Sequence, residues 1–184
     1  MTKHEELVEL LARRSARLGE FTLASGARSN LYIDARMTAM SPEGLALIGP
    51  LGMAAIADAG WNPDSVGGLT LGADPVSYAI AYASALAGTP IRAFTVRKEA
   101  KTHGTGKLIE GPFTPTDRVV VIEDVITTGG SALKAINAVK SAGATVIGVL
   151  SLVDRSEGGR ERIESEGYNV RSLASAAEIV ARMN

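Results

Sequence analysis

The sequence contains no cysteine, and this absence removes several kinds of chemistry from consideration. Without thiols the chain has no disulfide crosslinks, no thiolate metal ligands and no cysteine nucleophile. Such a composition is compatible with a reducing compartment. The amino terminus also lacks a basic stretch followed by an apolar one, so we expect a cytoplasmic protein without a secretory signal.

Aromatic residues, excess charge and long apolar runs are scarce as well. Only 4% of the 184 residues are aromatic, which argues against a nucleic-acid platform built from stacked rings. Lys and Arg number 19 against 20 Asp and Glu, so no general positive field attracts nucleic acid. No apolar run approaches the roughly 18 residues of a membrane span. We therefore expect no nucleic-acid and no membrane partner, and any polyanion site must be local.

Apolar residues, in contrast, make up 46% of the chain, and its length fits a single domain over residues 1–184. Continuous apolar segments alternate with segments of helical periodicity, which predicts an α/β fold with a central, mostly parallel sheet flanked by helices. An N-terminal unit, residues 1–40, combines a helix with a two-stranded hairpin over residues 21–36. The expected strands are 66–70, 91–96, 119–122, 146–153 and 168–172, and the expected helices are 3–18, 42–59, 75–87, 130–142, 157–166 and 174–183.

Residues 97–117 interrupt this alternation with a polar segment rich in Gly, Pro, Thr and Lys. A loop of this length inside a compact domain is typical of a functional loop. Its first part, residues 97–107, carries four cations and one anion with His103 neutral. A cationic loop can close over a polyphosphate and neutralise developing charge, and a solvated charged loop is the alternative.

The most informative segment is residues 119–131, where an apolar strand leads into two acids and a turn rich in Thr and Gly. Glu123-Asp124 suits sugar hydroxyls or a cation held through water. The turn that follows, Thr127-Thr128-Gly129-Gly130-Ser131, offers hydroxyls, close backbone approach and a helix N-terminus, all of which favour a phosphate. A sugar phosphate would satisfy both halves, and a capped turn with a solvated acidic pair is the alternative.

This segment resembles the phosphoribosyl-pyrophosphate (PRPP) motif of type I phosphoribosyltransferases. The resemblance implies the type I phosphoribosyltransferase fold, in which the turn holds the 5-phosphate and the acids contact ribose hydroxyls. It also implies Mg²⁺ as cofactor, held by PRPP and water near Glu123 and Asp124 without a direct protein ligand. The PRPP-binding residues carried over from this motif are Glu123, Asp124, Val125, Ile126, Thr127, Thr128, Gly129, Gly130 and Ser131.

The cationic loop narrows the resemblance, because Arg-Lys-Glu-x-Lys-x-His-Gly over residues 97–104 is similar to the flexible catalytic loop of orotate phosphoribosyltransferases. The resemblance implies that the loop closes across a homodimer interface and completes the neighbouring site. By position, the residues that would contact pyrophosphate and act in catalysis are Arg97, Lys98, Lys101 and His103, with Lys101 as the main catalytic cation.

Two further segments match the base-binding end of the same family. Residues 21–34 resemble its N-terminal hood, which places Tyr32 and Ile33 against orotate; a simple covering hairpin is the alternative. Arg155 follows an apolar strand and matches the position that pairs with the orotate carboxylate, a planar group suited to bidentate binding by guanidinium. A surface pair of Asp154 with Arg155 is the alternative, and Thr127 also reaches the base.

The loop at residues 71–76 corresponds to the pyrophosphate loop of the superfamily, which often contains a non-proline cis peptide. The bond between Ala73 and Asp74 is the expected one, and these two residues are expected to contact pyrophosphate. Many family members carry a lysine in this loop and another in the hood, where this chain has Ala24. Pyrophosphate binding should therefore depend more on residues 97–107 and on the metal.

Together these resemblances imply an orotate phosphoribosyltransferase activity. Such an enzyme transfers the phosphoribosyl group of PRPP to orotate, giving orotidine 5′-monophosphate and pyrophosphate in de novo pyrimidine biosynthesis. Two alternatives stay open: a phosphoribosyltransferase for a purine or uracil, and a non-catalytic PRPP or nucleotide sensor of the same fold. Neither a purine nor uracil carries the carboxylate that Arg155 would recognise.

Overall fold

A six-stranded sheet forms the centre of the protein, seen in a computed structural model that describes residues 1–22, 28–99 and 108–183. The strand order is β5-β4-β3-β6-β7-β8, and every neighbouring pair is parallel except β4 with β5. The α/β fold with a mostly parallel sheet is therefore confirmed. The strands are β3 (Ser65–Leu69), β4 (Arg92–Val96), β5 (Ile109–Glu110), β6 (Arg118–Ile126), β7 (Thr145–Asp154) and β8 (Val170–Ser175).

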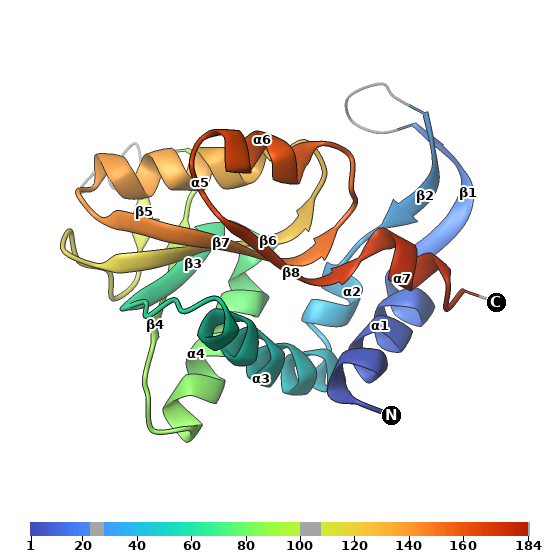
Figure 1. Cartoon of the computed structure of the whole chain (residues 1–184), viewed down its shortest axis with the longest axis horizontal. Helices are drawn as coiled ribbons and strands as arrows, with labels where there is room; N and C mark the ends of the chain where they lie inside the picture. Colours follow the sequence, from blue (N-terminus) through green and yellow to red (C-terminus); the bar gives the residue numbers. More distant parts are fainter. Residues whose placement is uncertain (23–27, 100–107, 184) are drawn as a thin grey trace.

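Helices cover both faces of this sheet (Figure 1). Helices α5 (Gly130–Ser141) and α6 (Gly159–Ser165) lie on one face, and α3 (Pro42–Asp58) and α4 (Ala73–Leu86) on the other. Strand β6 shows why its sequence is continuously apolar. Val119 and Val121 belong to the core beneath α5, whereas Val120 and Ile122 belong to the core beneath α3 and α4. Alternate side chains of a central strand point to opposite faces, so both sets are buried.

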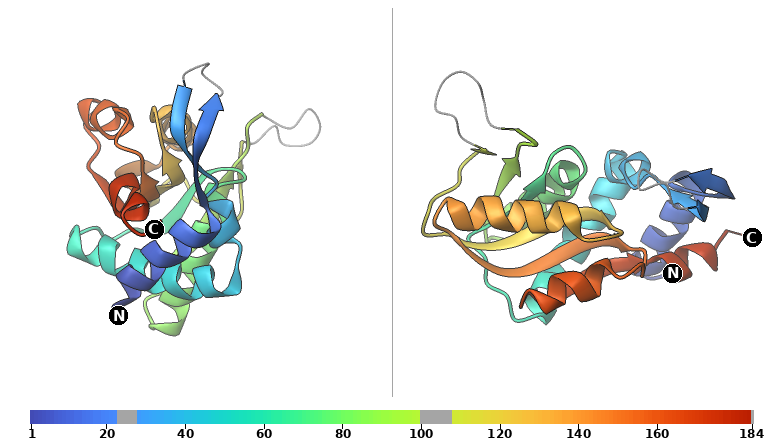
Figure 2. Two further views of the ribbon diagram at one scale, coloured as in Figure 1. Left: turned by 90° about the vertical axis from the view of Figure 1, so that its right-hand side faces the viewer. Right: turned by 90° about the horizontal axis from the view of Figure 1, so that it is seen from above.

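The N-terminal part of the chain forms a separate layer at one end of the sheet. Thr2 caps helix α1 (Lys3–Arg14), and the side chains of Thr2 and Glu5 form a capping box. The helix leads into the hairpin of β1 (Ala16–Thr22) and β2 (Arg28–Ile33), which projects from the rest of the molecule in Figures 1 and 2. Helices α2 (Arg36–Ala39) and α7 (Ala176–Val180) pack beside α1.

Several expected boundaries differ from the observed ones. The helix expected over 3–18 ends at Arg14, because Ala16 and Leu18 pair with β2. Strand β6 does not end before Glu123-Asp124 but continues to Ile126, because its pairing with β7 extends that far. Within the segment expected to be a loop, β5 pairs antiparallel with β4. Helix α2 was not expected, since four residues are too few to show a period.

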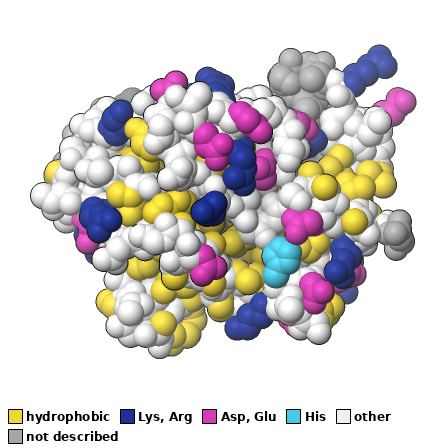
Figure 3. All heavy atoms as spheres, viewed as in Figure 1, with side chains coloured by type: hydrophobic (Ala, Val, Ile, Leu, Met, Phe, Trp, Pro, Cys, Tyr) yellow, Lys and Arg dark blue, Asp and Glu magenta, His cyan; other side chains and the backbone are white. Residues whose placement is uncertain are grey.

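The surface carries charges of both signs over the face drawn in Figure 3, as the balanced composition predicts. In the part of the chain that the structure describes, no helix is both long and apolar enough to cross a membrane.

Candidate active site

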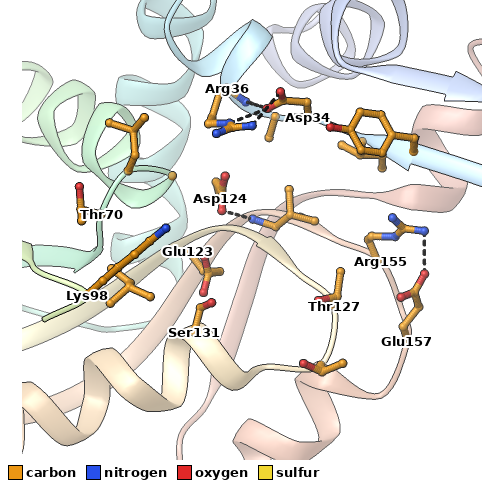
Figure 4. Close-up of a pocket in the computed structure, with 18 residues that line it drawn as sticks. Asp34, Arg36, Thr70, Lys98, Glu123, Asp124, Thr127, Ser131, Arg155 and Glu157 are labelled. Carbon is orange, nitrogen blue, oxygen red and sulfur yellow. Dashed lines mark hydrogen bonds and ion pairs between the residues drawn. The ribbon is translucent and has the colours of Figure 1, made fainter. Parts of the chain in front are cut away.

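A pocket of about 650 Å³ opens at the carboxyl ends of β3, β6 and β7 (Figure 4). These strands are neighbours in the sheet, so the loops that follow them converge at one edge, where parallel sheets bind ligands. The end of the hairpin closes the opposite side. The pocket is lined by Tyr32, Ile33, Asp34, Ala35, Arg36, Leu69, Thr70, Leu71, Gly72, Lys98, Glu123, Asp124, Val125, Thr127, Thr128, Ser131, Arg155 and Glu157.

The two acids of β6 have different surroundings. Glu123 is only 6% exposed, and burial, reinforced by the neighbouring Asp124 carboxylate, raises the pKa of Glu123 well above its ordinary value. Asp124 lies closer to the open pocket and accepts a hydrogen bond from the backbone N–H of Val125 at 2.9 Å. A Cβ at Gly72 would overlap the Asp124 carboxylate as it is placed, so the glycine lets the loop after β3 lie directly against this side chain.

The turn after β6 presents hydroxyls at the start of α5. Thr127, Thr128 and Ser131 line the pocket, and Gly129 precedes the helix with a φ of +74°. Helix α6 supports the turn from behind, where Arg162 Nη1 donates to the carbonyl oxygen of Thr128 at 3.1 Å. The result is a hydroxyl-lined helix N-terminus, an arrangement that binds phosphate through backbone N–H groups and the helix dipole. Ile126 is buried at the strand end and does not line the pocket.

The loop after β3 lines the pocket through Leu69–Gly72 rather than through the two residues expected from the sequence. The expectation of a cis peptide between Ala73 and Asp74 is wrong: the non-proline cis peptide joins Thr70 and Leu71. Ala73 and Asp74 instead begin α4 and are buried. Asp74 accepts hydrogen bonds from Thr70 Oγ1 at 2.7 Å and Thr95 Oγ1 at 2.8 Å, so it braces the loop from behind.

Arg155 is buried at the end of β7, although arginine is normally exposed. Its Nη2 donates to Ser29 Oγ and to the backbone oxygen of Leu31, both at 3.0 Å, and these bonds join the hairpin to the sheet. The alternative of a surface pair with Asp154 is not observed, because Asp154 pairs with Arg160 at 2.8 Å. Arg155 therefore faces the pocket and contacts the hairpin that also supplies Tyr32 and Ile33.

The expected catalytic cations divide into three groups. Lys98 lines the pocket, on the side away from Arg155, because β4 and β7 are separated by two strands. Arg97 does not line it; its Nη1 lies 3.5 Å from Glu110 Oε1, and its Nε is buried without a hydrogen-bond partner. Lys101 and His103 lie outside the described residues.

The sequence did not single out Asp34, Arg36 or Glu157 as pocket residues. Arg36 Nε and Nη2 donate to the two carboxylate oxygens of Asp34 at 2.8 and 3.0 Å, and this hydrogen bonding lowers the pKa of Asp34. Glu157 Oε1 lies 2.7 Å from Arg155 Nη2. The Asp-x-Arg spacing directly after the hairpin was a usable signal, whereas nothing local distinguishes Glu157 from other surface acids.

Comparisons with known proteins agree with this geometry. The phosphoribosyl transferase domain profile matches residues 42–181. The chain is 46% identical over 183 residues to the orotate phosphoribosyltransferase of Aquifex aeolicus, covering 98% of this chain and 99% of the relative. The corresponding protein of Mycobacterium avium is 48% identical over 175 residues, covering 95% of each.

Solved structures of orotate phosphoribosyltransferases are also similar to this chain. The crystal structure of Mycobacterium tuberculosis orotate phosphoribosyltransferase in complex with PRPP matches with a TM-score of 0.82 and 43% identity, covering 97% of this chain and 99% of that one. The adenine phosphoribosyltransferase of Leishmania tarentolae, at 19% identity and a TM-score of 0.66, shares the fold. Fold, pocket and profile together define a phosphoribosyltransferase. Within that class, the chain belongs to the orotate phosphoribosyltransferase family.

Proposed function

We propose that this protein transfers the 5-phosphoribosyl group of PRPP to orotate, with release of pyrophosphate, as a step in pyrimidine biosynthesis. The observation that carries the proposal is one pocket that combines Glu123-Asp124, a hydroxyl-lined helix N-terminus and the buried Arg155. The first two features suit a ribose phosphate, and the third suits a planar carboxylate.

The half of the pocket formed by β6 and α5 is proposed to bind PRPP. The backbone and hydroxyls of residues 127–131 would hold the 5-phosphate, with Val125 and Ile126 leading into the turn. Glu123 and Asp124 would accept hydrogen bonds from ribose hydroxyls. The loop at Leu69–Gly72 lies beside them and is the described segment best placed for pyrophosphate.

Charge is the main requirement of the reaction. Attack at the anomeric carbon passes through an oxocarbenium-like transition state, and negative charge develops on the departing pyrophosphate. The described lining contains three cationic side chains, Arg36, Lys98 and Arg155, against four carboxylates, so further positive charge must be supplied. We assign this role to Lys101, with Arg97, Lys98 and His103 as further contacts.

Mg²⁺ is the proposed cofactor, and the residues present are compatible with binding it through the substrate. Among the described residues, no group of three or more His, Asp or Glu side chains could hold a metal on its own. Asp124 borders the open pocket, whereas Glu123 is buried with a raised pKa and is a poor ligand. When bound, Mg²⁺ would neutralise pyrophosphate oxygens, and Asp124 would orient the water that surrounds it.

The other end of the pocket is proposed to bind orotate. Arg155 would pair with the orotate carboxylate, and Tyr32 and Ile33 would lie against the pyrimidine ring. Thr127, in the turn after β6, would also contact the base. Tyr32 is 41% exposed, and its ring centroid lies 5.4 Å from that of Phe21. The ring of Tyr32 can therefore stack on a planar ligand with little loss of side-chain conformational entropy.

Two finer elements complete the proposal, namely a homodimer in which the loop at residues 97–117 serves the neighbouring site, and a cytoplasmic location. An apolar hollow next to the pocket supports the dimer. Its apolar lining residues Met37, Met40 and Leu71 are 58%, 47% and 53% exposed, and Asp34, Arg36 and Ser41 complete the lining. Leu71 also lines the main pocket. An interface there would place a second copy at the mouth of the active site.

The test is a substrate panel with purified protein, Mg²⁺ and PRPP. Orotate, uracil, adenine, guanine and hypoxanthine are offered in turn, and base consumption is followed by absorbance and pyrophosphate release by a coupled assay. We expect turnover with orotate and a kcat/KM for uracil that is lower by about a hundredfold or more, because uracil has no carboxylate and forgoes a bidentate, charge-assisted pair with Arg155. Preferred use of another base would contradict the proposal, and absence of turnover with every base would favour the sensor alternative.

A further inference from the structure

The guanidinium of Arg155 is already occupied on one nitrogen. Nη2 lies 3.0 Å from Ser29 Oγ, 3.0 Å from the Leu31 backbone oxygen and 2.7 Å from Glu157 Oε1. This nitrogen carries two protons, so three acceptors saturate it. Nε, in contrast, is buried and has no hydrogen-bond partner. The Arg155 side chain is only 5% exposed. It therefore meets a ligand with Nη2 fully hydrogen-bonded and with Nε still lacking an acceptor.

Recognition of a carboxylate by guanidinium normally uses two adjacent N–H groups. One such edge joins Nε and Nη2, and the other joins Nη1 and Nη2. The pair of Arg36 with Asp34 in the same pocket uses the first edge, with Nε and Nη2 each donating to one oxygen. Both edges of Arg155 include the saturated Nη2. A planar carboxylate can therefore bind bidentately only when one of the three present acceptors leaves.

Glu157 is the acceptor that can leave. The Leu31 oxygen is part of β2, and Ser29 Oγ is fixed by hydrogen bonds with the backbone oxygen and N–H of Leu31 at 2.8 and 3.2 Å. The Glu157 side chain is 35% exposed, and within the described residues its ion pair with Arg155 is its only polar contact. Rotation of one partly exposed side chain releases Nη2 without moving the backbone.

The backbone conformation at Ser156 directs the Glu157 side chain toward Arg155. Ser156, between the two side chains, has a φ of +54°, a conformation that non-glycine residues rarely adopt. Its N–H donates to Asp154 Oδ1 at 2.8 Å, and Asp154 is itself held by Arg160. The chain thus reverses direction so that Arg155 and Glu157 face each other across the pocket wall, as Figure 4 shows.

We propose that Glu157 is a resident carboxylate that pairs with Arg155 in the empty site and is exchanged for the carboxylate of the substrate. The proposal rests on the proposed function, since it takes orotate as that substrate. The buried cation is then paired in both states, and this avoids the large penalty of an unpaired buried charge. A base without a carboxylate cannot replace Glu157, so the exchange also selects against uracil.

The test compares Glu157→Gln with the wild-type protein. Glutamine keeps the shape and the acceptor oxygen but lacks the charge, so orotate displaces it more easily. We expect the KM for orotate to fall about three- to tenfold, with kcat and the KM for PRPP unchanged within twofold, because a charged pair exceeds a neutral one by about 1 kcal/mol. Glu157→Asp, which retains the charge, should restore most of the wild-type KM for orotate.

Glu161→Gln is the matched control, because it removes the same charge from an exposed position on α6. It should leave the KM for orotate within twofold of the wild type. An unchanged or higher KM for orotate in Glu157→Gln, with wild-type turnover intact, would overturn the exchange and leave the proposed function standing. A wild-type protein that does not use orotate at all would overturn both.

Discussion

Among the residues that the structure describes, Glu123 has a carboxyl group whose pKa is raised well above its ordinary value. Burial raises its pKa well above the ordinary 4.5, so between these two values the folded protein holds a proton that the unfolded chain has released. A group of this kind makes the free energy of unfolding fall as the pH rises through that interval. The acid that is proposed to contact ribose therefore lowers the stability of the empty enzyme near neutral pH.

Replacement of Glu123 by glutamine should remove this effect. The amide keeps the side-chain shape without an ionisable group, so we expect a higher Tm than the wild type at pH 7 and a weaker decline of Tm as the pH rises above the ordinary pKa of 4.5. Thermal unfolding without ligand at a series of pH values measures both. Identical pH profiles for the variant and the wild type would show that the Glu123 carboxyl titrates normally.

At the scale of residues, the sequence identified most of the pocket residues proposed to bind PRPP and fewer of those at the end proposed to bind the base. Glu123 to Ser131 are contiguous, so one strand, one turn and one helix start bring them together. Glu157, Asp34 and Arg36 join the pocket only because the hairpin folds onto the end of β7 through Arg155, a contact across more than a hundred residues. No local pattern records such a contact.

Among the elements, the amino-terminal ends of three strands are joined by one buried carboxylate, Asp117. It accepts hydrogen bonds from Ser65 Oγ at 2.8 Å, from Arg92 Nη2 at 2.6 Å and from Thr114. Burial alone would raise its pKa, but these hydrogen bonds outweigh burial and lower it. The stabilisation is therefore complete above the ordinary pKa of 3.8 and declines as the pH falls through the lowered value.

Asp117→Ala should destabilise the protein by about 2–3 kcal/mol at pH 7, because it leaves donors at the starts of β3 and β4 without their acceptor. Urea unfolding measures the change, and Asp58→Ala, at an exposed position of α3, should stay within about 0.5 kcal/mol of the wild type. A loss at Asp117 no larger than that at Asp58 would mean that the network does not tie the strands together.

Element boundaries were less predictable from sequence than element types, and two cases show why. The period of α1 continues past Arg14 in sequence, but pairing with β2 turns Ala16 and its successors into a strand. Strand β6 likewise includes Glu123 and Asp124 because β7 supplies hydrogen-bonding partners along its whole length. In both cases a tertiary partner, absent from the local sequence, decides where the element ends.

For the whole molecule, the proposed dimer has a defined surface to test, namely the hollow lined by Met37, Met40 and Leu71. Met37→Glu places a charge in the proposed interface, so we expect a shift from dimer to monomer and a marked loss of turnover if the catalytic loop is shared. Light scattering with size-exclusion chromatography measures the mass. Val180→Glu, an exposed apolar position on α7, is the control and should leave both mass and rate unchanged. A Met37→Glu protein that stays dimeric would place the interface elsewhere.

The central claim is that Arg155 binds the carboxylate of the substrate. The kinetics of Arg155→Ala with orotate test this claim most directly. Loss of a bidentate, charge-assisted pair should lower kcat/KM for orotate by about a hundredfold or more, while the KM for PRPP stays within a few-fold of the wild type. Circular dichroism confirms that the variant is folded. An Arg155→Ala protein that keeps its wild-type kcat/KM for orotate would contradict the account.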